Sequence, residues 1–345
     1  MPGVETGLHL PGGCNTLSQL PLTIAISDYD HVRDFQDGRI EAEGIDANFL
    51  NFQVEEIFYR FVNFREWDVS EMSFGKYAAL KAMGDDSLTS IPVFPSRVFR
   101  LSSIFVTSES KLRSIADLAG KKVGVPEWAQ TAAIYTRGYL VHQAGIPLSD
   151  ITWVQAGVGM PGRKEKVALH LPDGVSLTPV ADKSLQEMLV AGEIDAIMSA
   201  HPPPLFEDGG GQVVRLLGDY QELEAAYFKE TGIFPIMHTI AINASVSDAH
   251  PWVLGNLLKA FNAAKETSVA RAREMTASRF PIPWAPFFAE QSASMFAGDY
   301  WPYGIEDNRV TLDAFLGYSF EQGVCARRLE VEDLFAKNVQ SSFKV

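Results

Sequence analysis

The segment GIFPIMHTIAI (residues 232–242) carries a histidine inside a run of apolar, strand-forming residues. In an extended strand, His238 shares one face with Ile236, Ile240 and Ile242. An imidazole in this setting either is a hydrogen-bonded core group or faces a cleft. In a cleft, histidine transfers protons near neutral pH. The second interpretation makes His238 a candidate catalytic residue.

Two other residues at strand ends could assist proton transfer. His201 directly follows the apolar segment IDAIMSA and precedes three prolines, which hold it in an extended loop. Asp28 follows the first predicted strand, LTIAIS. A solvated histidine and an aspartate that caps the next turn are the alternatives.

Three arginines could bind an anionic ligand. Arg97 and Arg100 lie in FPSRVFR, where a spacing of three places them on opposite faces of a strict strand. At most one of the two should therefore reach a given cleft. Arg163 lies in the Gly-rich loop GMPGRKE. An arginine fork is the natural partner of a carboxylate, and a surface or interlobe ion pair is the alternative role.

The segment VPEWAQT (residues 125–131) joins a predicted strand to a predicted helix. Backbone amides at a helix start, with the hydroxyl of Thr131, provide an anion site, and Arg137 lies two turns further on. The alternative is a capped helix with a solvated arginine. The other candidate ligand contacts in this connection or at strand ends are Tyr29, Ser73, Glu127 and Trp128.

Alternating strands and helices would position these residues. We predict strands at 22–27, 45–52, 69–73, 121–125, 151–155 and 194–199, with a long crossing strand at 91–107. We predict helices at 55–63, 112–118, 131–143, 183–191, 251–275, 284–296 and 312–322. The βαβ rhythm indicates parallel sheets with loops at the carboxyl ends of their strands.

The chain leaves a first lobe, builds a second and returns through GIFPIMHTIAI. This order predicts an α/β, two-lobed fold like that of the type II periplasmic binding proteins. Each lobe is expected to be a mainly parallel sheet flanked by helices, with the ligand cleft between the lobes. The predicted divisions are a flexible lead at 1–20, lobe 1 at 21–105 and 233–345, and lobe 2 at 106–232.

Composition limits the partners. The net charge of −14 argues against a nucleic-acid binder, and no run of ~18 apolar residues is available for a membrane helix. The N-terminus lacks the pattern of a secretory signal, so a cytoplasmic location is expected. Cys14 and Cys325 have no metal-ligand spacing, and no nucleotide, metal or redox motif is present. We therefore predict no cofactor.

Several segments resemble the 4,5-dihydroxyphthalate decarboxylase family. They are ISDYDHVRDFQDGRIEAEGIDANFL, FPSRVFRLS, VPEWAQTAAIYTRGYL, GIFPIMHTIAI and DYWPYGIEDNRVTLDAFLGYSFEQG, and the resemblance runs over residues 22–330. Two positions depart from the family pattern. Leu101 stands where a histidine is common, and His201 stands where an arginine is common. These departures concern the substrate more than the scaffold.

The resemblance implies a cytosolic lyase of phthalate degradation that converts 4,5-dihydroxyphthalate to protocatechuate and CO2. His238 would donate the proton, and His201 or Asp28 would handle the phenolic oxygen. Arg97, Arg100 or Arg137, with Thr131, would hold a carboxylate. The alternatives are a non-catalytic binder of a small aromatic or other anion, and a decarboxylase of another hydroxybenzoate. A homodimer is possible, because the aromatic-rich C-terminal third could pack within the chain or between subunits.

Overall fold

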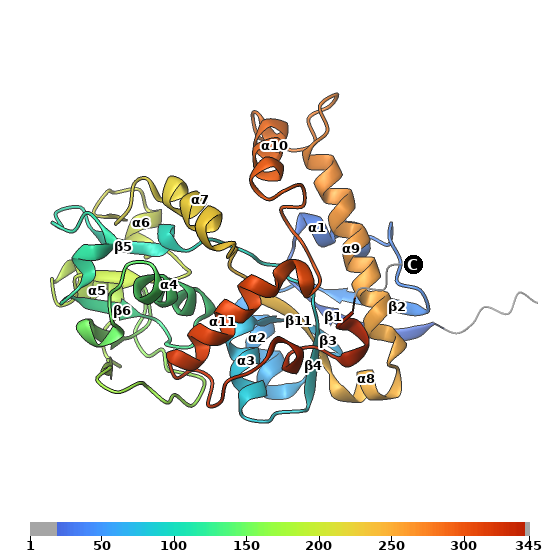
Figure 1. The fold of residues 1–345 in the computed structure, drawn as a ribbon, viewed down its shortest axis with the longest axis horizontal. Coiled ribbons are helices and arrows are strands. Elements are labelled where there is room, and N and C mark those ends of the chain that lie inside the picture. Colours follow the sequence, from blue (N-terminus) through green and yellow to red (C-terminus); the bar gives the residue numbers. More distant parts are fainter. Residues whose placement is uncertain (1–18, 342–345) are drawn as a thin grey trace, which may run out of the picture.

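A computed structural model describes residues 19–341 of the chain. The predicted flexible lead lies outside the described residues except for its last two positions, and Cys14 lies outside them too. Figure 1 shows two groups of strands and helices with the helix α11 (Arg309–Glu321) lying between them. No helix in the described range is both long enough and apolar enough to cross a membrane.

Within residues 19–341, the first sheet has five strands in the order β2–β1–β3–β11–β4. Their bounds are β1 Leu20–Ala25, β2 Ile45–Leu50, β3 Val69–Ser73, β4 Leu88–Ile91 and β11 His238–Asn243. The strand β3 is central and buried along its whole length. Its last residue, Ser73, lies opposite His238, the first residue of β11.

The second sheet, counted over the same range, has six strands in the order β10–β5–β9–β6–β7–β8. Their bounds are β5 Ile104–Thr107, β6 Lys122–Val125, β7 Thr152–Gln155, β8 Leu177–Pro179, β9 Ala196–Met198 and β10 Val213–Arg215.

Both sheets are mixed rather than mainly parallel. The strands β2, β1 and β3 run parallel, and so do β9, β6, β7 and β8. The strands β11, β5 and β10 pair antiparallel with their neighbours. The parallel parts are the predicted βαβ units. The antiparallel pairings arise where the chain crosses between the sheets or returns.

The α-helices are α1 Asp30–Gln36, α2 Val54–Phe64, α3 Phe74–Ala82, α4 Thr131–His142, α5 Leu185–Val190, α6 Pro204–Glu207, α7 Tyr220–Thr231, α8 Ala244–Ala249, α9 Trp252–Ala272, α10 Ala285–Met295 and α11. The helix α2 buries Ile57 and Phe61, a spacing of four that places both side chains on one face. The helix α4 is buried over most of its length, because α3 and α11 pack against it.

Two predicted elements were wrong. The crossing segment is not one strand, because β4 ends at Ile91 and β5 begins at Ile104. Pro92 and Pro95 lie between them and have no N–H for a sheet hydrogen bond. The helix predicted at 112–118 is a single 3-10 turn, Ile115–Leu118, which a capping box opens.

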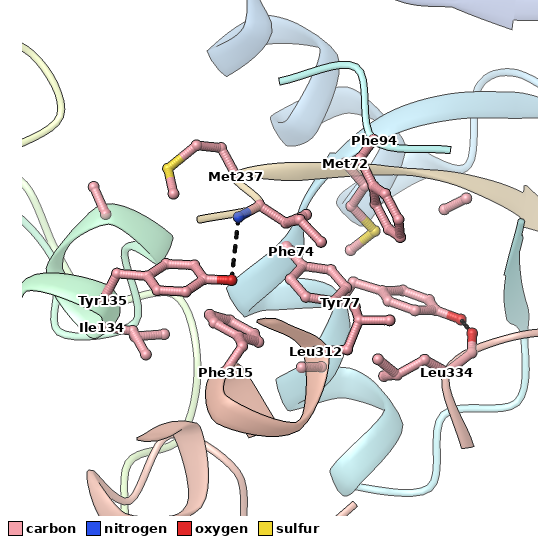
Figure 2. Packing of buried hydrophobic residues seen from close by; sticks show 14 of the residues in the cluster. Met72, Phe74, Tyr77, Phe94, Ile134, Tyr135, Met237, Leu312, Phe315 and Leu334 are labelled. Carbon is pink, nitrogen blue, oxygen red and sulfur yellow. Dashed lines mark hydrogen bonds between the residues drawn. The ribbon is translucent and has the colours of Figure 1, made fainter. Parts of the chain in front are cut away.

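A buried aromatic cluster joins α3, α4 and α11 beneath the junction of the two sheets (Figure 2). The ring of Phe315 stacks on Phe74 at 4.7 Å and lies 5.1 Å from the ring of Tyr135. The hydroxyl of Tyr135 accepts a hydrogen bond from the backbone N–H of Ile236 at 3.1 Å. One cluster therefore fixes both helices relative to the segment that leads into β11.

The helices α4 and α11 approach closely at Gly138. A Cβ added to Gly138 would lie 2.4 Å from the ring of Tyr318, so only glycine fits there without displacing that ring. This close approach packs α11 directly against α4, the helix that follows β6 of the second sheet.

The C-terminal aromatic residues divide into two groups. Phe296 packs on Phe228 at 4.2 Å, and Tyr303 is buried within the chain. Trp284, Phe287 and Phe288 are exposed on and just before α10. In Figure 1, α10 and the end of α9 project from the body of the molecule.

Candidate functional site

A cavity of about 80 Å³ lies where the carboxyl end of β3 meets the amino-terminal ends of β11, α3 and α4. A wider, more open cavity of about 690 Å³ adjoins it, and the two share Glu55, Gln130, Arg163, Lys166 and His201. The other residues that line the smaller cavity are Val54, Phe58, Ser73, Lys76, Arg100, Glu127, Thr131, Ala132, Ala200, Met237 and His238.

One wall of the cavity carries His238 in contact with a buried carboxylate. The Nδ1 atom of His238 lies 2.6 Å from Oε1 of Glu71, whose side chain is 0% exposed. Glu71 lies on β3 and His238 at the start of the adjacent β11, so neighbouring backbones place both side chains on one face. Glu71 is not among the site residues predicted from the sequence.

Two more donors fix the Glu71 carboxylate. The hydroxyl of Tyr29 donates to Oε1 at 2.5 Å, and the backbone N–H of Ser27 donates to Oε2 at 2.9 Å. Burial, together with the nearby Glu71 charge, raises the pKa of Tyr29, so this phenol stays protonated. The carboxylate is therefore held by three donors, one of them the imidazole.

The other imidazole nitrogen, Nε2, is available for proton transfer. Within residues 19–341, Nε2 of His238 has no hydrogen-bond partner, and 16% of the side chain is exposed, at the cavity wall. The ring of Phe58 meets the imidazole edge-on at 4.9 Å. A carboxylate on Nδ1 selects the tautomer and ring orientation, which leaves Nε2 for proton transfer.

The starts of α3 and α4 meet at the floor of the cavity. The hydroxyl of Thr131 lies 3.1 Å from that of Ser73 and accepts a hydrogen bond from the N–H of Gly75 at 3.0 Å. A Cβ on Gly75 would lie 2.8 Å from the carbonyl oxygen of Ala129, so this close approach depends on glycine. Two helix N-termini therefore direct their positive ends toward the cavity.

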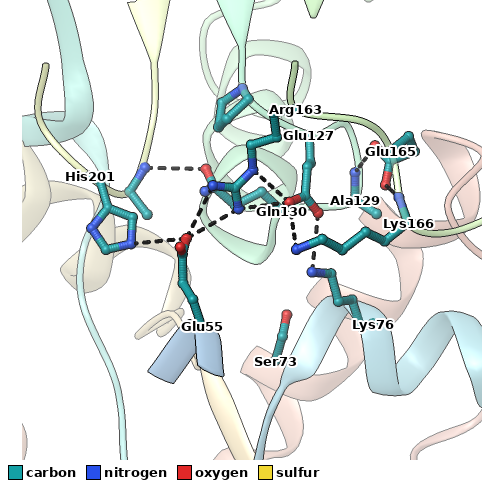
Figure 3. A network of polar contacts seen from close by, with 12 residues as sticks. Glu55, Ser73, Lys76, Glu127, Ala129, Gln130, Arg163, Glu165, Lys166 and His201 are labelled. Atoms are coloured by element: carbon teal, nitrogen blue, oxygen red, sulfur yellow. Dashed lines mark hydrogen bonds and ion pairs between the residues drawn. The ribbon is translucent and has the colours of Figure 1, made fainter. Parts of the chain in front are cut away.

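The opposite wall is a network of charges around Glu127 (Figure 3). Its carboxylate, 1% exposed, lies 3.1 Å from Nζ of Lys76, 2.7 Å from the guanidinium of Arg163 and 3.3 Å from Nζ of Lys166. Burial raises the pKa of Glu127, but these three cations outweigh it and lower the pKa overall. Burial also lowers the pKa of Lys76 despite its pairing with Glu127.

Glu55 completes this wall at the edge toward the wider cavity. Its Oε1 lies 3.1 Å from Arg163 and 3.6 Å from Nε2 of His201 (Figure 3). Glu55 comes from the first turn of α2, whereas Arg163 and His201 come from the second sheet's loops. The contact therefore bridges the two sides of the cleft.

Arg100 also lines the cavity, and Arg97 does not. The Nε of Arg100 donates to Sδ of Met237 at 3.1 Å, and no carboxylate of the described residues lies within salt-bridge distance of it. Burial lowers the pKa of Arg100 to about 10, which leaves the guanidinium charged at neutral pH. Arg100 is thus a cation available to an anionic ligand.

The structure places the other predicted arginines in structural positions. Arg97 is buried and donates to Asn308 and to the backbone carbonyl of Phe234. Arg137 is buried against the ring of Trp128 at 3.8 Å and donates to Gln322. These side chains were predicted to hold a ligand carboxylate, and neither of them lines the cavity. Each buried guanidinium has one side-chain and at least one backbone acceptor, although Nε of Arg97 and one terminal nitrogen of Arg137 have no partner among residues 19–341.

Two predicted residues near the end of β1 and one near β6 also lie away from the cavity. The side chain of Asp28, predicted to handle the phenolic oxygen, is 67% exposed, lies 3.5 Å from Arg33 and does not line the cavity. Tyr29 lies behind His238, where it supports Glu71 rather than lining the cavity. Trp128 is buried in the core, where its Nε1–H donates to the carbonyl of Gln322.

Three charged residues at the site were missed along with Glu71: Glu55, Lys76 and Lys166. The strand Val69–Ser73 offered a signal, because a glutamate buried in a central strand requires donors. Lys76 lies three residues after the strand end, and Lys166 lies beside Arg163 in the basic loop. Across residues 19–341, no group of three or more His, Cys, Asp and Glu side chains is arranged to hold a metal ion.

Comparison with known proteins gives the family. No protein-family model matches the chain. It is 35% identical over 330 residues to the 4,5-dihydroxyphthalate decarboxylase of Comamonas testosteroni, covering 95% of this chain and 100% of that protein. It is also 35% identical over 214 residues to the enzyme of the same name from Pseudomonas putida, covering 62% of this chain and 83% of that protein.

Solved structures show the same fold at low identity. The periplasmic aliphatic sulphonate binding protein SsuA from Escherichia coli superimposes with a TM-score of 0.52 at 15% identity, covering 94% of this chain and 99% of that one. The desulfurization enzyme DSZB gives a TM-score of 0.51 at 12% identity, covering 93% and 98%. The predicted periplasmic-binding-protein-like fold is confirmed. Because of the decarboxylase matches, the chain belongs to the 4,5-dihydroxyphthalate decarboxylase family and is a carbon–carbon lyase.

Proposed function

We propose that this enzyme removes CO2 from 4,5-dihydroxyphthalate and releases protocatechuate. The observation that carries the proposal is the Glu71–His238 pair, which presents a free imidazole nitrogen to a cavity lined by cations. Relatives that bear the name of this activity at 35% identity support the same substrate. The reaction would take place in the cytoplasm as a step of phthalate degradation.

The chemistry requires a proton at a ring carbon. Each carboxylate of this substrate lies para to a hydroxyl, whose oxygen can donate electron density to the ring. Protonated His238 would transfer its Nε2 proton to the carbon that bears the leaving carboxylate, while the para oxygen stabilises the positive charge on the ring. The C–C bond then breaks, its electron pair restores aromaticity, and CO2 departs. The transferred proton stays on the ring carbon, and His238 regains a proton from solvent.

Glu71 would support this step through the imidazole. The carboxylate accepts the Nδ1 proton, fixes the ring and stabilises the imidazolium that donates at Nε2. General acid catalysis of this kind contributes about 100- to 10,000-fold in rate. Phe58, which meets the imidazole edge-on, limits the access of water to the reacting carbon.

The retained carboxylate would bind to Arg100 on the cavity floor. Arg100 lines the cavity and its Nε is bonded to Met237, while the hydroxyls of Ser73 and Thr131 lie at the converging helix starts. This places the anion where two helix N-termini and one guanidinium favour it. The leaving carboxylate would then lie toward Phe58 and Val54, where fewer charges stabilise it.

The variant His238→Ala tests the proposal. The variant should still bind 4,5-dihydroxyphthalate but release CO2 at least ~100-fold more slowly, the scale of lost acid catalysis. CO2 release and the ultraviolet spectrum of the ring report turnover, and calorimetry reports binding. Near-normal turnover by the variant would exclude His238 as the proton donor. If the wild type binds the acid but does not turn it over, the chain acts on another hydroxybenzoate or only binds it, and a panel of hydroxylated benzoates separates these outcomes.

A further inference from the structure

The cavity that contains His238 is too small for the proposed substrate. Its volume is about 80 Å³, whereas an engineered protein cavity that binds benzene, a smaller molecule than this substrate, measures about 150 Å³. The adjoining cavity of about 690 Å³ has ample room. An aromatic diacid can therefore reach His238 only if side chains between the two cavities move.

Glu55 lies at this boundary and lines both cavities. Its Oε1 accepts from both terminal nitrogens of Arg163, at 3.2 and 3.1 Å, and lies 3.6 Å from His201. Its side chain is 50% exposed, in contrast to Glu127, which holds Arg163 from the other side and is 1% exposed. Of these two carboxylates, only Glu55 can exchange its contact with Arg163 for a contact with water at a small cost in free energy.

The contacts of Glu55 are those a ligand carboxylate would make. A guanidinium edge offers paired donors, and an imidazole stands beside it. Burial raises the pKa of Glu55, but Arg163 and His201 lower it overall, so the group is an anion at neutral pH. The free protein thus fills an anion position with its own side chain.

We propose that Arg163 and His201 form an entry subsite for an aromatic carboxylate, and that Glu55 is an internal competitor which the incoming acid displaces. Displacement breaks a contact between α2 and the loop of Arg163, which joins the two cavities into one. After CO2 is lost, Glu55 returns to Arg163 and favours release of the monoacid product. The identity of the incoming acid rests on the proposed function. The competition between Glu55 and a carboxylate for Arg163 does not depend on it.

The test compares Glu55→Gln with Glu56→Gln. Glu56 is the next residue on α2, is 49% exposed and pairs with Arg60 at 2.8 Å, and it does not line either cavity. Each variant removes one negative charge from the same helix turn. Glu55→Gln should lower both the Kd for protocatechuate and the KM for the dihydroxyphthalate substrate about 3- to 5-fold, the scale of a part-exposed ion pair. Glu56→Gln should leave both constants unchanged.

A double variant isolates the competition. In an Arg163→Met background, the Glu55→Gln substitution should no longer lower the Kd, because the shared cation is gone. An unchanged or raised Kd in Glu55→Gln would overturn the proposal, since it would show that Glu55 does not oppose the acid. Equilibrium binding of protocatechuate and phthalate measures this without turnover. Failure of the wild type to decarboxylate 4,5-dihydroxyphthalate would instead contradict the proposed function alone.

Discussion

On one wall of the cavity the carboxylate of Glu71 meets the imidazole of His238, and on the other wall the carboxylate of Glu55 meets the guanidinium of Arg163. Glu71 is 0% exposed and accepts from three donors, one on β11 and two in the loop after β1. Glu55 is 50% exposed and comes from one helix turn. Two ion pairs of similar chemistry thus differ in how firmly the fold holds them.

This difference in burial suits the two ion pairs to different roles, one in proton transfer and the other in ligand binding. A buried, fully bonded carboxylate cannot move without leaving unpaired polar groups, so it keeps the imidazole in one orientation. A part-exposed carboxylate exchanges its partner for water at little cost. The first wall suits a step that needs fixed geometry, and the second suits entry and exit of an anion.

The largest effect should follow from the variant Glu71→Gln, which removes the ion pair between Glu71 and His238. The amide nearly preserves the shape of the side chain but no longer stabilises an imidazolium. We expect kcat to fall at least ~100-fold with little change in KM, and the pH profile of kcat to change, because the proton donor is affected and substrate binding is not.

Thermal unfolding of Glu71→Gln serves as the control, since the side chain is buried. A destabilised variant with an unchanged pH profile would show that Glu71 only supports the fold. A fall in kcat alone, without a change in the pH profile, would contradict the role assigned to the pair.

Removal of the Arg100 guanidinium should have the next largest effect. Arg100→Met takes away the guanidinium that has no carboxylate partner among residues 19–341. We expect KM to rise about 10- to 100-fold, the range for a hydrogen bond to a charged group, with a smaller change in kcat. Steady-state kinetics separates the two constants.

Arg100→Lys is the matched control, because it keeps the charge but loses the planar fork. Its KM should lie between those of the wild type and Arg100→Met. A wild-type KM in Arg100→Met would place the retained carboxylate elsewhere in the cavity.

The smallest effect is expected at Asp28, which belongs to neither wall. Its side chain is 67% exposed, and among residues 19–341 it forms an ion pair only with Arg33. Asp28→Asn should change kcat/KM by no more than about 2-fold, as for an ordinary surface substitution. A larger loss, measured by the same kinetics, would mean that Asp28 approaches the substrate and that the cleft closes further.

Sequence patterns predicted the parts of the site that depend on strand order. His238 stood out because it interrupts an apolar strand, and Ser73 and Thr131 because they lie where a strand ends or a helix begins. Glu71 was missed because its partners, Ser27 and Tyr29, lie more than forty residues away in the chain. Only the pairing of β1, β3 and β11 brings these groups together.

The arginines show a second reason why the sequence pattern did not predict the whole site. The prediction that only one of Arg97 and Arg100 faces the cleft rested on a regular strand, and that strand is interrupted by Pro92 and Pro95. One of the two does line the cavity, but backbone carbonyls from distant segments decide which. Arg137 was predicted to bind an anion, although its helix is buried on nearly all sides. Amphipathic patterns cannot show a partner that packs from another part of the chain.

Several elements of the fold were predicted closely from the sequence. The strand β3 and the helices α4, α9 and α10 lie within a few residues of their predicted bounds. The three-residue strands β8 and β10 were missed, because such short segments bury too few side chains to leave a periodic pattern.

The hydrogen bond between Ile236 and Tyr135 has a consequence for how the imidazole is positioned. Tyr135 belongs to the helix that follows the second sheet's strand β6, and Ile236 precedes His238 by two residues. The backbone that carries His238 is therefore anchored from two sides, by its pairing with β3 in the first sheet and by a side chain that belongs to the second sheet's helix. A residue far from the substrate thus helps to set where the proton-transferring nitrogen lies.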